Sequence, residues 1–149
     1  MKIGAPAEKA AGEARVALTP DSAKQLMKLG HECLIQKGAG KLAGFSDKAY
    51  EDAGVKIVAT AKALWAGSDV IIKVQKPEKS ELAYLDKSKT LIGFFWPGQN
   101  EEALKEAKKN RCYCYCDGYG AAYLARPEDG CAVLNGKHRR LSCCNRGRE

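Results

Sequence analysis

Short apolar runs alternate with helical patterns along residues 1–110 of the 149-residue chain. Five runs have the length and the aliphatic content of strands, and they lie at residues 1–5, 33–35, 55–58, 69–74 and 91–95. Several segments between them carry apolar residues three and four positions apart, which is the spacing of one helix face. This alternation is typical of a mostly parallel sheet covered by helices. We therefore predict an α/β fold.

Residues that cap helices stand at the expected boundaries of these helical segments. Thr19 is a good N-cap and Pro20 suits the first helical position, so a helix should start there. Gly30 suits the left-handed position that ends such a helix. By the same reasoning, further helices should follow Ser46, Thr60 and Asn100.

The runs at 69–74 and 91–95 are apolar along most of their length, which predicts burial on both faces of the sheet. After the helix that follows Asn100, the pattern requires another strand near residue 111. That strand should complete the next repeat of the fold.

The composition of the chain changes at that point. Residues 1–110 contain seventeen lysines and Arg15 as their one arginine, whereas residues 111–149 contain one lysine and six arginines. Cys33 stands alone in the first part, and the other six cysteines lie in the tail. We therefore predict a domain over 1–110 and an aberrant, poorly ordered tail over 111–149. The last strand of the domain would then have an open edge.

Composition and charge exclude several classes of protein. Hydrophobic residues make up 45% of the chain, and no run reaches the roughly 18 apolar residues of a membrane helix. The net charge of +7 is spread thinly over lysines, so we expect no nucleic-acid partner. The N-terminus lacks the features of a secretion signal, which predicts a cytoplasmic location without direct insertion into a membrane.

A glycine-rich stretch follows the second apolar run and invites comparison with a dinucleotide-binding turn. Gly38, Gly40 and Gly44 are close together, but Ala43 stands where the third glycine of that fingerprint belongs. The position suited to an acidic ribose-binding residue is Val58. We predict a loop that needs small residues, without nucleotide binding.

Arg15 and Lys73 are the two candidate ligand-binding residues. A guanidinium can bind a carboxylate or a phosphate at two points, although an exposed surface charge is the more common role. Lys73 interrupts the apolar run from Val70 to Val74, so its ammonium must either reach solvent or meet a partner. His31 follows the first helix and suits the negative helix end better than a catalytic role.

Eight motifs in register span residues 1–110, and they lie at residues 1–4, 12–20, 26–31, 37–40, 45–47, 53–54, 71–74 and 90–100. Together they resemble the N-terminal domain shared by alanine dehydrogenases and the alpha subunits of proton-translocating NAD(P) transhydrogenases. Within the last of these motifs, the stretch from Trp96 to Asn100 is similar to transhydrogenases. Alanine dehydrogenases are expected to carry a histidine in that stretch. They are the alternative family to transhydrogenases.

The resemblance implies hydride transfer between NAD(H) and NADP(H), coupled to proton translocation. It also implies a second alpha subunit and an NADP(H)-binding membrane beta subunit as partners, which would place the chain at the inner membrane through those partners. In alanine dehydrogenases, the residues matching Arg15 and Lys73 hold the substrate. No catalytic residue is carried over.

The tail can be explained by a shifted reading frame. Pro127 to Cys131 can be encoded CCA-GAA-GAT-GGA-TGC, and reading one nucleotide later gives Gln-Lys-Met-Asp-Ala, which the family is expected to carry. The same shift converts residues 112–144 into a family-like stretch. The rival hypothesis is a zinc module, but the adjacent Cys143 and Cys144 and the C-x-C spacing do not suit structural zinc sites. We therefore expect no bound metal.

These features imply that the chain by itself is inactive. In the family, the loop that contacts the nicotinamide lies in the region of the tail, and a second, Rossmann-type lobe is expected. We therefore expect no cofactor-binding residues in frame, no bound cofactor and no catalysis by the chain alone. The alternatives are an alanine dehydrogenase fragment, a non-enzymatic interaction fragment or a gene remnant, and the open edge predicts a tendency to aggregate.

Overall fold

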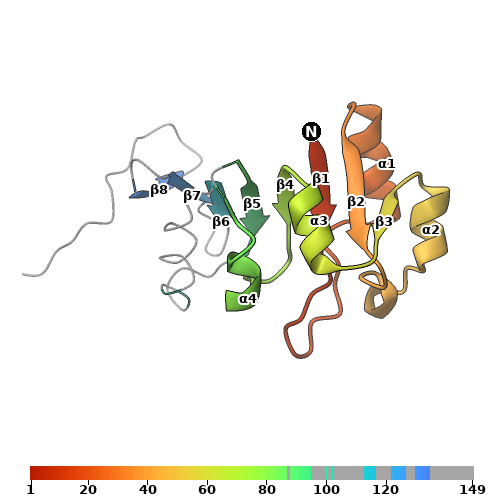
Figure 1. Ribbon diagram of the computed structural model, residues 1–149, viewed down its shortest axis with the longest axis horizontal. Coiled ribbons are helices and arrows are strands. Elements are labelled where there is room, and N and C mark those ends of the chain that lie inside the picture. Colours follow the sequence, from red (N-terminus) through yellow and green to blue (C-terminus); the bar gives the residue numbers. More distant parts are fainter. Residues whose placement is uncertain are drawn as a thin grey trace, which may run out of the picture.

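The structure is a computed structural model that describes residues 1–86, 88–94, 100, 102, 113–116, 122–126 and 130–134 (Figure 1). The strands are β1 (Lys2–Ala5), β2 (Glu32–Gln36), β3 (Lys56–Val58), β4 (Val70–Ile72), β5 (Thr90–Gly93), β6 (Tyr113–Cys116), β7 (Ala122–Arg126) and β8 (Gly130–Leu134). The helices are α1 (Pro20–Lys28), α2 (Asp47–Asp52), α3 (Ala61–Gly67) and α4 (Lys79–Leu82), with a short 3-10 helix η1 (Lys41–Ala43).

The strands form one sheet in the order β3-β2-β1-β4-β5-β6-β7-β8. The pairs from β3 to β6 are parallel, and β7 and β8 are antiparallel to their neighbours. From β1 the chain first builds outward to β2 and β3, then returns to β4 on the other side of β1. The strand order therefore reverses between β1 and β4, which is where open α/β sheets place ligands.

The predicted caps set the helix boundaries. Thr19 accepts a hydrogen bond from the Ser22 backbone N–H and starts α1, while Gly30 follows its end with a φ of 84°. Ser46 and Thr60 cap α2 and α3 in the same way. Such caps each contribute about 1 kcal/mol. The helix predicted after Asn100 lies mostly outside the described residues, and α4 was not predicted.

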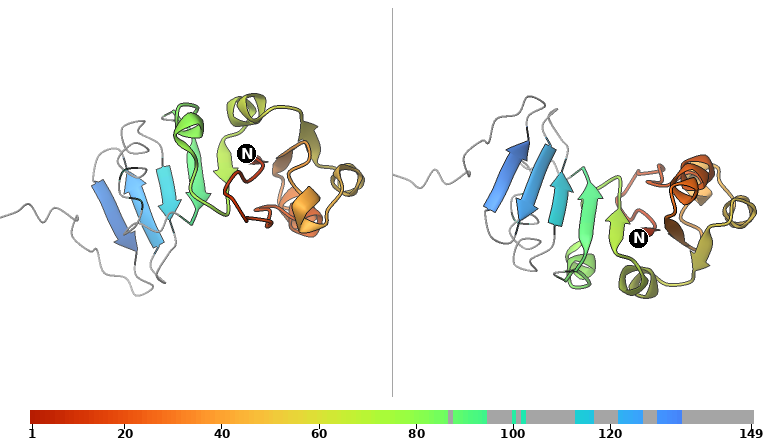
Figure 2. Two further views of the ribbon diagram at one scale, coloured as in Figure 1. Left: turned by 90° about the horizontal axis from the view of Figure 1, so that it is seen from below. Right: turned by 90° about the horizontal axis from the view of Figure 1, so that it is seen from above.

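Side chains alternate between two hydrophobic clusters on opposite faces of the sheet. Leu34 joins the cluster that includes Trp65 of α3 and Leu82 of α4, whereas Cys33 and Ile35 join the cluster that includes residues of α1 and α2. Figure 2 shows α3 and α4 on one side of the sheet and α1 on the other. The predicted α/β fold, a mostly parallel sheet flanked by helices, is confirmed.

Two expectations about the end of the sheet were wrong. Ile92 of β5 is 37% exposed, so this strand is not buried on both faces among the described residues. The edge of β5 is not open either, because β6 pairs with it from Thr90 to Gly93. Alternating tyrosines favour a strand over residues 113–116 even in the unusual composition of the tail.

No helix among the described residues is long and apolar enough to span a membrane.

Candidate functional site at the strand switch point

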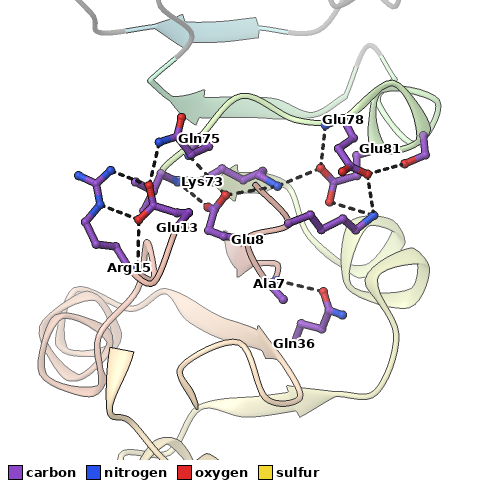
Figure 3. A network of polar contacts seen from close by, with 12 residues as sticks. Ala7, Glu8, Glu13, Arg15, Gln36, Lys73, Gln75, Glu78 and Glu81 are labelled. Atoms are coloured by element: carbon purple, nitrogen blue, oxygen red, sulfur yellow. Dashed lines mark hydrogen bonds and ion pairs between the residues drawn. The ribbon is translucent and has the colours of Figure 1, made fainter. Parts of the chain in front are cut away.

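Two loops meet where the strand order reverses, and we call residues 6–19 and 73–78 the switch-point loops. The first follows β1 and leads to α1, and the second follows β4 and leads to α4. Because β1 and β4 are parallel neighbours, both loops start at the same edge of the sheet. Figure 3 shows that most of the polar network at this edge comes from these two loops.

Lys73 is buried at the start of the second loop. Its side chain is 1% exposed, and its Nζ lies 2.9 Å from Oε2 of Glu81 and 3.6 Å from Oε2 of Glu8. Both carboxylates are equally inaccessible, since their side chains are 1% and 4% exposed. Burying a charge without a partner costs much free energy. The two carboxylates offset this cost for the ammonium group of Lys73.

Glu8 also joins the backbones of the two loops. Its Oε1 accepts a hydrogen bond from the Val74 N–H at 2.6 Å, and its Oε2 accepts one from the Gln75 N–H at 3.4 Å. The N–H groups just past the end of β4 are therefore satisfied by a side chain of the first loop. This carboxylate fixes the distance between the loops.

Glu13 is the second carboxylate that joins the loops. It accepts hydrogen bonds from Arg15 Nε at 2.7 Å, Arg15 Nη2 at 2.6 Å and Gln75 Nε2 at 2.8 Å. The backbone N–H of Arg15 donates to it as well, at 3.0 Å. The bonds from the Arg15 side chain, then from Gln75 and the Arg15 backbone, lower the pKa of Glu13 from 4.5 to about 2.

Two further ion pairs extend the network towards α4. Lys9 lies 3.4 Å from Oε2 of Glu78 and 3.7 Å from Oε1 of Glu81. That Glu81 oxygen is buried and has no hydrogen-bond partner within the described part of the chain. The Glu78 backbone N–H donates to the other oxygen of Glu81 at 3.0 Å, which ties α4 to the site.

The structure places the two predicted site residues on the two switch-point loops but does not bring their charges together. Arg15 is exposed, as expected, whereas Lys73 meets buried partners, as a charge in an apolar run requires. Figure 3 shows their side chains extending to opposite sides, Arg15 towards Glu13 and Lys73 towards Glu81. In this arrangement Lys73 is inaccessible to a ligand.

Sequence reasoning missed the carboxylates of the site, which are Glu8, Glu13 and Glu81. The one available signal was Lys73, because a charge within a strand demands a partner. Nothing in the sequence specifies that one partner is three residues past β1 and the other on α4.

The glycine-rich stretch at residues 38–44 forms a tight loop between β2 and α2. Gly38 and Gly44 have φ values of 76° and 82°, and only the three-residue η1 lies between Gly40 and Gly44. A Cβ on Gly40 would lie 2.7 Å from the Tyr50 ring, so packing alone requires this glycine. The prediction of a loop that needs small residues is confirmed.

Other predicted features lie largely outside the described residues. These are Trp96 to Gln99 and the side chains of the tail cysteines. Asn100 is described, and its Oδ1 accepts a hydrogen bond from Lys76. Within the part that the structure describes, no group of three or more His, Cys, Asp or Glu residues could hold a metal.

The chain is similar in sequence and fold to transhydrogenases and alanine dehydrogenases. The chain is 56% identical over 109 residues to the NAD(P) transhydrogenase subunit alpha of Cereibacter sphaeroides, covering 73% of this chain and 21% of that protein. It is 35% identical over 136 residues to the alanine dehydrogenase of Halomonas elongata, covering 90% and 35%. A solved transhydrogenase from Sinorhizobium meliloti superposes with a TM-score of 0.73 at 28% identity, covering 78% and 34%.

The chain therefore spans only about a fifth to a third of the length of these relatives. The sequence model of the family described as "Alanine dehydrogenase/PNT, N-terminal domain" matches residues 4–117, which run from within β1 to just past the end of β6. With the same fold in a solved relative, this match shows that the chain belongs to the alanine dehydrogenase/PNT N-terminal domain family, whose members include transhydrogenase alpha subunits.

Proposed function

We propose that residues 1–110 are the first lobe of an NAD(P) transhydrogenase alpha subunit. The observation that carries this proposal is the 56% identity to a transhydrogenase alpha subunit, compared with 35% to an alanine dehydrogenase. The whole protein would transfer hydride between NAD(H) and NADP(H), coupled to proton translocation. Its partners would be a second alpha subunit and a membrane beta subunit, which would hold this lobe at the membrane surface.

In this proposal the cofactors supply the redox chemistry and the protein positions them. The lobe described here contributes the switch-point loops and the rigid sheet behind them. Its glycine loop has Ala43 in place of the third glycine of a dinucleotide fingerprint, which supports the proposal that the NAD(H) contacts lie in other parts of the whole protein. We therefore propose that the 149-residue chain by itself neither binds NAD(H) appreciably nor transfers hydride, because a few contacts do not offset the ordering cost of binding.

Arg15 is the ligand-binding residue that the geometry favours. It is exposed at the strand switch point, and its guanidinium suits a carboxylate or a phosphate. Lys73 could share that ligand only after leaving Glu8 and Glu81. The alternative function, the first lobe of an alanine dehydrogenase, is favoured by the location of both cations on loops at one edge of the sheet.

A domain exchange tests the choice between the two enzymes. Residues 1–110 replace the matching segment of the Cereibacter sphaeroides alpha subunit, and hydride transfer between NADH and an NADP analogue is measured with its partner subunits. We expect the chimaera to keep at least about a tenth of the parental rate, since the sheet and loops are preserved. The same exchange into the Halomonas elongata alanine dehydrogenase is the control, and activity there alone would favour the alternative.

We also propose that residues 111–149 are the next segment of the family read in a shifted frame. The change in composition at residue 111 and the recovery of a family-like stretch after a one-nucleotide shift support this proposal. The alignment to the transhydrogenase relative covers only 109 residues, whereas the family match continues to residue 117. The rival zinc module has no support from the cysteine spacing.

DNA sequencing across codon 111 tests the shifted frame. We expect that reading one nucleotide later restores a continuous coding sequence that includes Gln-Lys-Met-Asp-Ala in place of Pro127 to Cys131. A DNA sequence whose shifted frame is interrupted by stop codons would contradict the proposal.

A further inference from the structure

Arg15 is held by one edge of its guanidinium only. Glu13 binds the edge formed by Nε and Nη2, at 2.7 and 2.6 Å. A guanidinium has five N–H donors, so Nη1 and the second N–H of Nη2 remain for another partner. Within the described part of the chain, no hydrogen bond is recorded for that second edge, and the Arg15 side chain is 67% exposed.

Glu13 differs from an ordinary surface partner of an arginine. Its side chain is 7% exposed, whereas the carboxylate of the surface pair between Glu32 and Lys56 is 37% exposed. Glu13 also accepts a hydrogen bond from the side-chain amide of Gln75, which lies on the other switch-point loop. The carboxylate is thus anchored independently of Arg15, and it can impose one orientation on an otherwise mobile side chain.

We propose that Glu13, braced by Gln75, is the positioning residue that presents the free edge of Arg15 to the oxyanion of a ligand, either a carboxylate or a phosphate. This inference rests on the proposed role of Arg15 in ligand binding. A long arginine side chain costs free energy when it is ordered on binding. Glu13 imposes that order before the ligand arrives, which strengthens binding of the oxyanion.

Simple electrostatics makes the opposite prediction for this residue. Removing a carboxylate next to a cation raises the local potential and should strengthen the binding of an anion. If Glu13 positions Arg15, its removal weakens that binding instead. The sign of the change therefore separates a positioning role from a purely electrostatic one.

The test is an NMR titration of the full chain with pyruvate and, separately, with inorganic phosphate, at constant ionic strength. The variants are Glu13→Gln, Gln75→Leu and Arg15→Lys, and Glu32→Gln is the matched control at a surface ion pair. We expect Glu13→Gln to weaken binding of the preferred anion about three- to tenfold, as loss of one ordered side chain predicts. Gln75→Leu, which keeps the charge, should weaken it less, and Glu32→Gln should leave it unchanged.

A second readout reports the orientation of Arg15 directly. The Nε–H signal of Arg15 should be protected from solvent exchange in the unmodified chain and in Glu32→Gln, and should lose that protection in Glu13→Gln. Loss of binding in Arg15→Lys with unchanged binding in Glu13→Gln would overturn the inference while the proposed role of Arg15 stands. Unchanged binding in Arg15→Lys, or no binding of either anion by the unmodified chain, would overturn both.

Discussion

Buried polar side chains need hydrogen-bond partners within the fold, and Tyr50 of α2 is an example. Tyr50 is fully buried, and its hydroxyl donates to the Leu18 carbonyl oxygen at 2.8 Å. Burial, with a smaller contribution from Asp47, raises the pKa of Tyr50 from 10 to about 12. The neutral phenol thus stabilises the folded chain below pH 10, and this stabilisation is lost as the pH rises through about 12.

The Tyr50→Phe variant tests this assignment. At pH 7 it should be less stable by about 1 kcal/mol, because it loses the hydrogen bond to Leu18. The difference from the unmodified chain should shrink above pH 10, since only the unmodified chain must then keep a phenol neutral. Urea unfolding across this pH range measures the effect, and Tyr84→Phe at the surface should change stability little. A difference that grows with pH would contradict the prediction.

For Lys73, the sequence predicts the need for a buried partner but not the identity of that partner. A lysine in an apolar strand requires a partner, and the structure supplies Glu8 and Glu81. The requirement was visible in the sequence because desolvation is a local property. The partners were not, because they depend on how distant segments fold together.

Helix α3 can pack closely on strand β1 because a glycine, Gly4, faces it. A Cβ on Gly4 of β1 would lie 2.2 Å from Ser68 Oγ and 2.9 Å from Ser68 Cβ, just after α3. The Ser68 hydroxyl is itself bonded to the Leu64 carbonyl oxygen at 2.8 Å, so it cannot move freely. Gly4 therefore sets the distance between α3 and the sheet.

The Gly4→Ala variant should accordingly be destabilised by about 1–3 kcal/mol, the usual cost of overpacking. Gly67→Ala is the matched control, because its Cβ would meet only Leu34 Cδ2 at 3.7 Å at the end of α3. It should be neutral or slightly stabilising, since alanine favours the helix. Chemical denaturation measures both. Equal stabilities for the two variants would show that β1 and α3 do not pack as described.

Element boundaries were largely predictable for residues 1–74. Capping residues such as Thr19, Ser46 and Thr60 act through neighbouring backbone groups, so a local pattern contains the needed information. The short α4 was missed because its N-cap is Glu78, whose capping box depends on Glu81 and the buried network. Burial of β5 on both faces was wrongly predicted, since an apolar run does not reveal what covers it.

At the scale of the whole molecule, the fold class followed from alternating patterns, but the strand order did not. Pairing of β1 with both β2 and β4 places the switch point, and that pairing joins residues far apart in the sequence. The edge of β5 is likewise covered by β6, the strand that the pattern required near residue 111. Long-range pairing, unlike capping, is weakly encoded in local sequence.

We propose that residues 1–110 form one lobe of a transhydrogenase alpha subunit whose cofactor chemistry requires the rest of the protein. Calorimetric titration of the 149-residue chain with NADH tests this proposal, with the whole alpha subunit of Cereibacter sphaeroides as the positive control. We predict binding heat for the control and no micromolar binding for the chain. Micromolar NADH affinity of the chain alone would show that binding does not require the rest of the protein.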